Sequence, residues 1–170
     1  MRVPYHRAVA NTAYLRREVE RYVRDQLSDE FHQSFTSEFL ALRPGGRHEF
    51  DAVSADRSVV ASVKSASGLT SGGKKPSGKI KDCLAELYYL SLVDAPIRRL
   101  VLTTPAFFDI FEKVTAGAIA DGLALVCMPL PPEMQRQVDL IVQEASKEVT
   151  PAAAAAAVAS QVETDVDSGR

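Results

Sequence analysis

The chain lacks any apolar run long enough to cross a membrane. The longest uncharged apolar stretch, Leu123 to Leu130, is far shorter than the roughly 20 residues that a transmembrane helix needs. Arg2, His6 and Arg7 near the N-terminus are not followed by the apolar stretch of a signal peptide. We therefore expect a soluble, cytoplasmic protein that has no signal peptide and no membrane partner.

Cysteine is scarce, and so is any excess of charge of one sign. Cys83 and Cys127 lie in apolar stretches without the CxxC or Cys/His spacing of a zinc site. We expect both to be small buried side chains in a reducing cytoplasm. The formal net charge of −2 gives no overall attraction to polyanions, so nucleic acid would have to be bound by local basic patches.

The chain does contain enough apolar material for one globular domain. Of its 170 residues, 46% are apolar and 25% are charged, a balance that can bury a single core. We expect this domain to span residues 1–150. Residues 151–170, an alanine run followed by acids, have too little apolar bulk to pack, which indicates a frayed helix or a disordered tail.

Hydrophobic periodicity predicts an ordered series of helices and strands. A helix is expected over residues 14–27, then two strands around the turn at 44–46, and a third strand over 59–64. Helices over 78–93, 105–120 and 132–149 then alternate with strands over 99–104 and 123–130. Three strands with short connections form an antiparallel meander, so the prediction is a mixed α/β sheet with helices on both faces.

Two charged residues fall on neighbouring strands of the predicted meander. Asp51 lies on the second strand, and Lys64 ends the third strand thirteen positions later, across a tight turn. Strict alternation places Ser62 on the face of Lys64, and Asp51 on the face of Val53. Because antiparallel neighbours bring such side chains together, we expect Asp51, Ser62 and Lys64 to converge.

This arrangement suits a metal-dependent phosphodiesterase. The Asp51 carboxylate would hold Mg²⁺ through a hard oxygen, and the backbone carbonyl of Val63 and water would complete the coordination. The metal would polarise the phosphate and lower the pKa of a bound water, while Lys64 would stabilise the charge that develops during attack. The alternative is a surface salt bridge between Asp51 and Lys64, a pairing that often arises by chance.

The run His48-Glu49-Phe50-Asp51-Ala52-Val53, followed by Val59-Val60-Ala61-Ser62-Val63-Lys64 and a helix, resembles the PD-(D/E)xK superfamily of restriction-endonuclease-like nucleases. The element order from Tyr14 to Thr104 is similar to the αβββαβ core of that superfamily, which would leave a C-terminal αβα extension. The resemblance implies that Asp51 is the first acid of the motif, preceded by Phe50 in place of proline, and that Lys64 is its lysine. It further implies Mg²⁺ as cofactor and nucleic acid as partner, DNA more than RNA.

The second acid of that motif falls on Ser62. A hydroxyl is a weak, neutral Mg²⁺ ligand, so the site is either inactive or completed by a carboxylate from elsewhere. In this superfamily the second acid sometimes lies on the following helix, which indicates Glu86, with Asp82 as the weaker candidate. An acid of the first helix contributes in some members, and we favour Glu18 because it borders the apolar side, whereas Glu20 shares the arginine face.

Basic residues follow the candidate site. Lys74, Lys75, Lys79 and Lys81 lie in a glycine-rich loop and at the start of the next helix, where they would contact phosphates together with the helix N-terminus. A solvated loop explains them equally well. Glu86 also has an ordinary interpretation, as a surface acid that pairs with nearby lysines.

Two further motifs carry less weight. His48 could act as a base or a ligand, but its position between charged neighbours at a strand start favours a partly exposed structural histidine. The segment Ser71-Gly72-Gly73-Lys74 lacks the spacing of a phosphate-binding loop, so we reject that function.

The sequence therefore predicts a nuclease-like domain, a Mg²⁺-dependent phosphodiesterase acting on DNA or RNA. The alternative is a catalytically inactive member of the same fold that serves as a nucleic-acid-binding or protein-assembly module. A third interpretation is a small α/β interaction module unrelated to nucleic acid. A homodimer is compatible with cleavage of both strands, although no interface signature is found.

Overall fold

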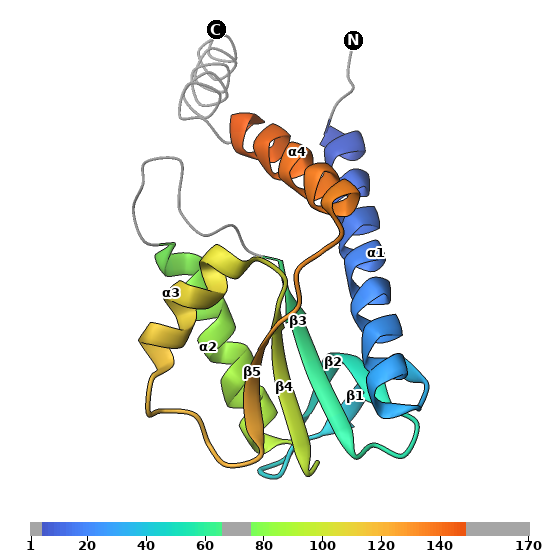
Figure 1. Cartoon of the computed structure of the whole chain (residues 1–170), viewed down its shortest axis with the longest axis vertical. Helices are drawn as coiled ribbons and strands as arrows, with labels where there is room; N and C mark the ends of the chain where they lie inside the picture. The colour runs from blue at the N-terminus through green and yellow to red at the C-terminus, as the bar shows by residue number, and fades with distance from the viewer. Residues whose placement is uncertain (1–4, 66–75, 149–170) are drawn as a thin grey trace, which may run out of the picture. The chain divides into compact units, whose positions relative to one another are not determined.

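The computed structural model describes residues 5–65 and 76–148 (Figure 1). By their contacts the residues group into two units, of which the larger is Arg17–Pro131. The other unit comprises Met1–Arg16 and Pro132–Arg170, and its described parts are residues 5–16 and 132–148. The expected tail at 151–170 lies outside the described residues.

The element order agrees with the one predicted from the sequence. The chain forms α1 (Tyr5–Phe31), β1 (Phe35–Ala41), β2 (Arg47–Ser54), β3 (Val59–Lys64), α2 (Ser77–Leu92), β4 (Ile97–Leu102), α3 (Pro105–Thr115), β5 (Leu123–Cys127) and α4 (Pro132–Glu148).

Three helix boundaries differ from the prediction. The first helix begins at Tyr5 instead of residue 14, and the other two differences concern helix ends. The first helix was expected to end at Ser28, but it continues to Phe31, just before His32, whose φ of 53° is left-handed. The third helix was expected to reach residue 120, yet it ends at Thr115. Gly117, just beyond it, has a φ of 73°, which is the left-handed conformation that commonly terminates helices.

The sheet has the order β1-β2-β3-β4-β5, and it is mixed. Strands β1, β2 and β3 pair antiparallel, which confirms the predicted meander. Strands β3, β4 and β5 pair parallel, so α2 and α3 are the crossover helices between them.

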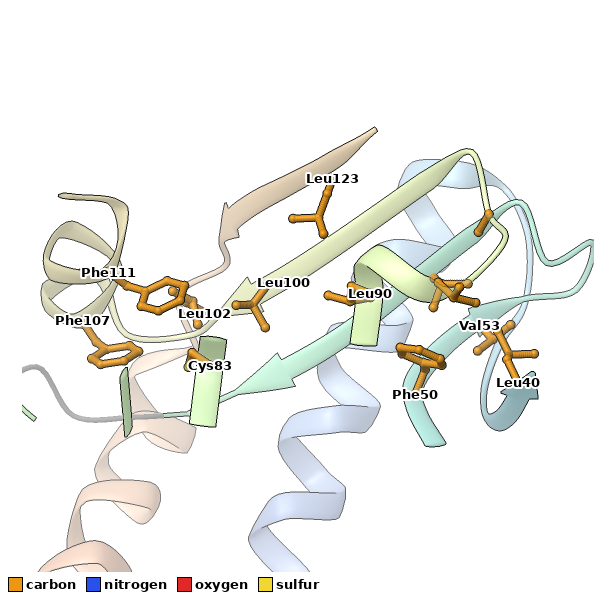
Figure 2. Packing of buried hydrophobic residues seen from close by; sticks show 13 residues of the cluster. Leu40, Phe50, Val53, Cys83, Leu90, Leu100, Leu102, Phe107, Phe111 and Leu123 are labelled. Atoms are coloured by element: carbon orange, nitrogen blue, oxygen red, sulfur yellow. The ribbon is translucent and has the colours of Figure 1, made fainter. Parts of the chain in front are cut away.

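Helices cover both faces of this sheet within the larger unit (Figure 1). Helices α2 and α3 share an apolar core with one face, where Phe107 and Phe111 of α3 lie near Cys83 of α2 and Leu102 of β4 (Figure 2). On the other face, Arg99 of β4 pairs with α1, through Glu30 at 2.7 Å and the ring of Phe31 at 4.6 Å. The mixed, layered α/β architecture is therefore as predicted.

Strand β2 contains an irregularity at Asp51 that strict alternation did not anticipate. Opposite β1, Phe50 pairs with Glu38 and Val53 with Thr36, so β2 holds one residue more than its partner between these pairs. As in a β-bulge, the extra residue breaks the alternation, and Phe50 and Val53 both enter the core beside α2. Strict alternation, which predicted that Asp51 shares the face of Val53, therefore does not apply across this irregularity.

None of the helices in the described part of the chain is both long and apolar enough to cross a membrane.

Candidate functional site

Asp51 lies at the bulge of β2, where its side-chain carboxylate, in place of a backbone carbonyl, accepts a hydrogen bond from β3. The paired residues of these strands are Ala52 with Ala61 and Val53 with Val60. Beyond them, Asp51 Oδ2 accepts a hydrogen bond from the backbone N–H of Val63 at 2.7 Å. The Asp51 side chain is buried, with the residue only 9% exposed, so the bulge holds a carboxylate inside the sheet.

The backbone carbonyl of Val63 lies on the Asp51 side of β3. The carbonyl of the next residue, Lys64, accepts from the N–H of Thr103, which follows β4, at 3.1 Å. Successive residues of a strand direct their backbone groups to opposite neighbours, so the N–H and C=O of Val63 both point toward β2. The two oxygens predicted from the sequence as metal ligands, from Asp51 and Val63, therefore lie on the same side of β3.

Glu86 extends from α2 to the end of β3. Its Oε1 accepts from Lys64 Nζ at 2.7 Å, and its Oε2 accepts from the Ser62 hydroxyl at 3.0 Å. The cation that pairs with Glu86 is therefore Lys64 of strand β3, whereas Lys81 of α2 is exposed. As a result, the Ser62-Val63-Lys64 tripeptide binds two carboxylates, that of Asp51 through its backbone and that of Glu86 through its side chains.

The environment of Glu86 favours its ionised form. Burial by itself raises the pKa of this carboxyl, but the hydrogen bond and charge of Lys64, with hydrogen bonds to His48 and Ser62, outweigh burial and hold the pKa below its usual value. Glu86 therefore stays anionic near neutral pH, as a metal ligand or an ion-pair partner must.

His48 also contacts this cluster, which the sequence interpretation missed. Its Nε2 lies 3.2 Å from Glu86 Oε2, and its ring stacks on Tyr89 with 3.9 Å between centroids. The side chain is partly exposed, as predicted for a structural histidine. Its contact with Glu86 spans 38 positions of the chain, a separation at which local patterns give no signal.

The two candidate acids of the first helix, Glu18 and Glu20, pair with different arginines. Glu18 pairs with Arg21, whose side chain is 66% exposed. Glu20 lies 3.8 Å from Arg24, and Arg24 donates to the backbone carbonyl of Asp51 at 2.8 Å. Through Arg24, Glu20 is therefore linked to β2, although both residues belong to the predicted arginine face; the preference for Glu18 stays a prediction.

The basic residues predicted to contact phosphates are only partly described. Lys74 and Lys75 lie outside the described residues. Lys79 is half-buried in the first turn of α2 and takes part in an electrostatic or hydrogen-bonding contact, while Lys81 and Asp82 are exposed.

The donor set at the site is oxygen-rich but small. Over residues 5–65 and 76–148, no group of three or more His, Cys, Asp and Glu side chains is arranged to hold a metal ion. Mg²⁺ commonly uses only one or two carboxylates and completes its coordination with water and substrate phosphate. The two carboxylates and the Val63 carbonyl are of the chemical type that suits this ion.

No family model, curated protein or solved structure matches this chain.

Proposed function

We propose that the chain carries a restriction-endonuclease-like domain of the PD-(D/E)xK type that hydrolyses phosphodiesters in nucleic acid, DNA more than RNA, with Mg²⁺. The observation that carries the proposal is the contact of Glu86 with Ser62 and Lys64, because it brings a carboxylate to the position where the sequence motif lacks one. The αβββαβ order of elements, with β1 to β5 in sequential order in the sheet, supports the same assignment.

The residues have distinct roles in this proposal. Asp51, Glu86 and the Val63 carbonyl would hold Mg²⁺, which when bound lowers the pKa of a water and polarises a phosphate. Lys64 contributes a fixed positive charge at the end of β3, where it would stabilise negative charge that develops on the phosphate. The Ser62 hydroxyl and Lys64 both orient the Glu86 carboxylate.

A cleavage assay with matched variants tests this proposal. Supercoiled plasmid, single-stranded DNA and RNA are incubated with Mg²⁺ or Mn²⁺ and with wild type, Asp51→Ala, Glu86→Gln or Lys64→Gln. We expect each variant to lower the cleavage rate by about 100-fold or more, because each removes a ligand or the charge beside the phosphate.

Glu30→Gln is the matched control. Glu30 also forms an ion pair, with Arg99, and its pKa is also lowered, chiefly by the hydrogen bond from Arg99, but it lies on the opposite face of the sheet. Its substitution should leave cleavage unchanged. Cleavage by Asp51→Ala at the wild-type rate contradicts the proposal. Salt-sensitive binding without metal-dependent cleavage supports the inactive nucleic-acid-binding member of the fold instead.

A further inference from the structure

The His48 ring is held in one orientation by aromatic contacts from two elements. It stacks on Tyr89 of α2 with 10° between the ring planes, and it meets Phe50 edge-on with 4.9 Å between centroids. Tyr89 follows Glu86 by three positions, so the two side chains lie on the same side of α2. The helix that supplies the carboxylate therefore also supplies the surface that orients the histidine.

We infer that His48 is a positioning residue that fixes the Glu86 carboxylate for a divalent cation. Its Nε2 lies 3.2 Å from Glu86 Oε2, the oxygen that also accepts from Ser62 at 3.0 Å. The other oxygen accepts from Lys64 at 2.7 Å. Three donors from β2 and β3 thus hold one flexible side chain from α2. The metal-binding role of Glu86 in this inference rests on the function proposed above.

Such positioning matters because a glutamate side chain has several rotatable bonds and loses entropy when it is fixed. A ligand that its neighbours already orient binds a metal more tightly than one that must be ordered on binding. Partners that hydrogen-bond to a metal ligand commonly change metal affinity by about 10- to 100-fold. Both the Nε2–H tautomer of neutral histidine and its charged form can donate to Glu86, so this role requires no change of protonation.

Two substitutions separate the hydrogen bond from the ring. His48→Phe keeps an aromatic ring against Tyr89 and removes the donor. His48→Gln removes the ring and keeps an N–H donor at a similar distance from the backbone. His32→Gln is the control, because His32 is an exposed histidine of the same chain.

The readout is the dissociation constant for Mn²⁺, measured by calorimetry on the full chain, with unfolding in urea measured for each variant. We expect His48→Phe to weaken Mn²⁺ binding about tenfold or more, and His48→Gln to stay within about threefold of wild type. His32→Gln should bind as wild type does.

Three results overturn the inference, and they are distinguishable. Wild-type affinity in His48→Phe, or equal losses in His48→Phe and His48→Gln, shows that the donor does not position Glu86. With either of these two results, tight Mn²⁺ binding by the wild type remains consistent with the proposed function. A wild-type chain that binds no Mn²⁺ overturns the proposed function and this inference with it.

Discussion

Burial and electrostatics act in opposite directions on the Glu86 carboxylate. Burial raises its pKa, whereas the ammonium of Lys64 and the donors of His48 and Ser62 lower it, and the lowering prevails. The charged form is therefore more stable in the folded protein than in the unfolded chain. This difference links the stability of the domain to pH.

The linkage predicts how Glu86 contributes to acid unfolding. Because its folded pKa lies below the ordinary value of 4.5, its stabilising effect is complete above pH 4.5 and is lost as the pH falls through the folded pKa. In metal-free buffer, Glu86→Gln should lower the free energy of unfolding by about 1–2 kcal/mol at about pH 5.5, with a smaller difference at about pH 3.5.

Urea unfolding at these two pH values measures the effect, in a window below that in which free histidine titrates. A difference between wild type and Glu86→Gln that grows toward acid pH would contradict the sign of the shift.

Burial has a different effect on Cys83, where desolvation outweighs the lowering of the pKa by the nearby charge of Lys64. Desolvation raises the pKa of its thiol to about 12, and the side chain is only 1% exposed, so it is an unreactive part of the core. This agrees with the sequence interpretation of a small buried side chain. Cys127 is free as well but only partly buried.

At the scale of elements, the connection from α3 to β5 depends on glycines. Gly117 and Gly122 both have a φ of 73°, a conformation that is strained for other residues. Their surroundings differ. A Cβ on Gly122 would lie 3.0 Å from the Pro96 carbonyl oxygen and 3.0 Å from Arg98 Nη2, whereas a Cβ on Gly117 would meet nothing within 4 Å.

This difference predicts unequal costs for the same substitution. Gly117→Ala should lower the free energy of unfolding by about 1 kcal/mol, the cost of the left-handed backbone alone. Gly122→Ala should lower it by about 2–3 kcal/mol, because its Cβ also displaces backbone at the start of β4. Urea unfolding of the two variants measures the difference, and equal losses would show that the close approach of Pro96 is not maintained.

Elements were predictable from the sequence where the hydrophobic pattern is strong. The β-branched run of β3 and the apolar stripe of α2 identify these elements almost to their observed bounds. The bulge at Asp51 was not predictable, since an extra residue in one strand leaves the local composition unchanged. The contact of Arg24 with the Asp51 carbonyl was not predictable either, because the helical pattern places Arg24 on a solvent-facing arginine face.

At the scale of the whole molecule, the candidate site joins parts of the chain that no local pattern connects. Asp51 and Lys64 could be placed on neighbouring strands because the turn between β2 and β3 is short. Glu86 was nominated only through resemblance to a family, and its contact with Lys64 depends on how α2 packs across the sheet. The contact between Glu86 and Lys64 therefore depends on tertiary packing, which local patterns in a single sequence do not reveal.

The central claim is that Glu86 supplies the metal-binding carboxylate that the sequence motif would place at Ser62. Moving the carboxylate from Glu86 to position 62 tests this claim most directly. The Mn²⁺ affinity of the full chain is measured for wild type, Glu86→Ala, and the double variant Ser62→Asp with Glu86→Ala. We predict binding by the wild type, a loss of about 100-fold or more in Glu86→Ala, and substantial recovery when Asp replaces Ser62 on β3. Mn²⁺ binding by Glu86→Ala that equals the wild type would contradict the claim.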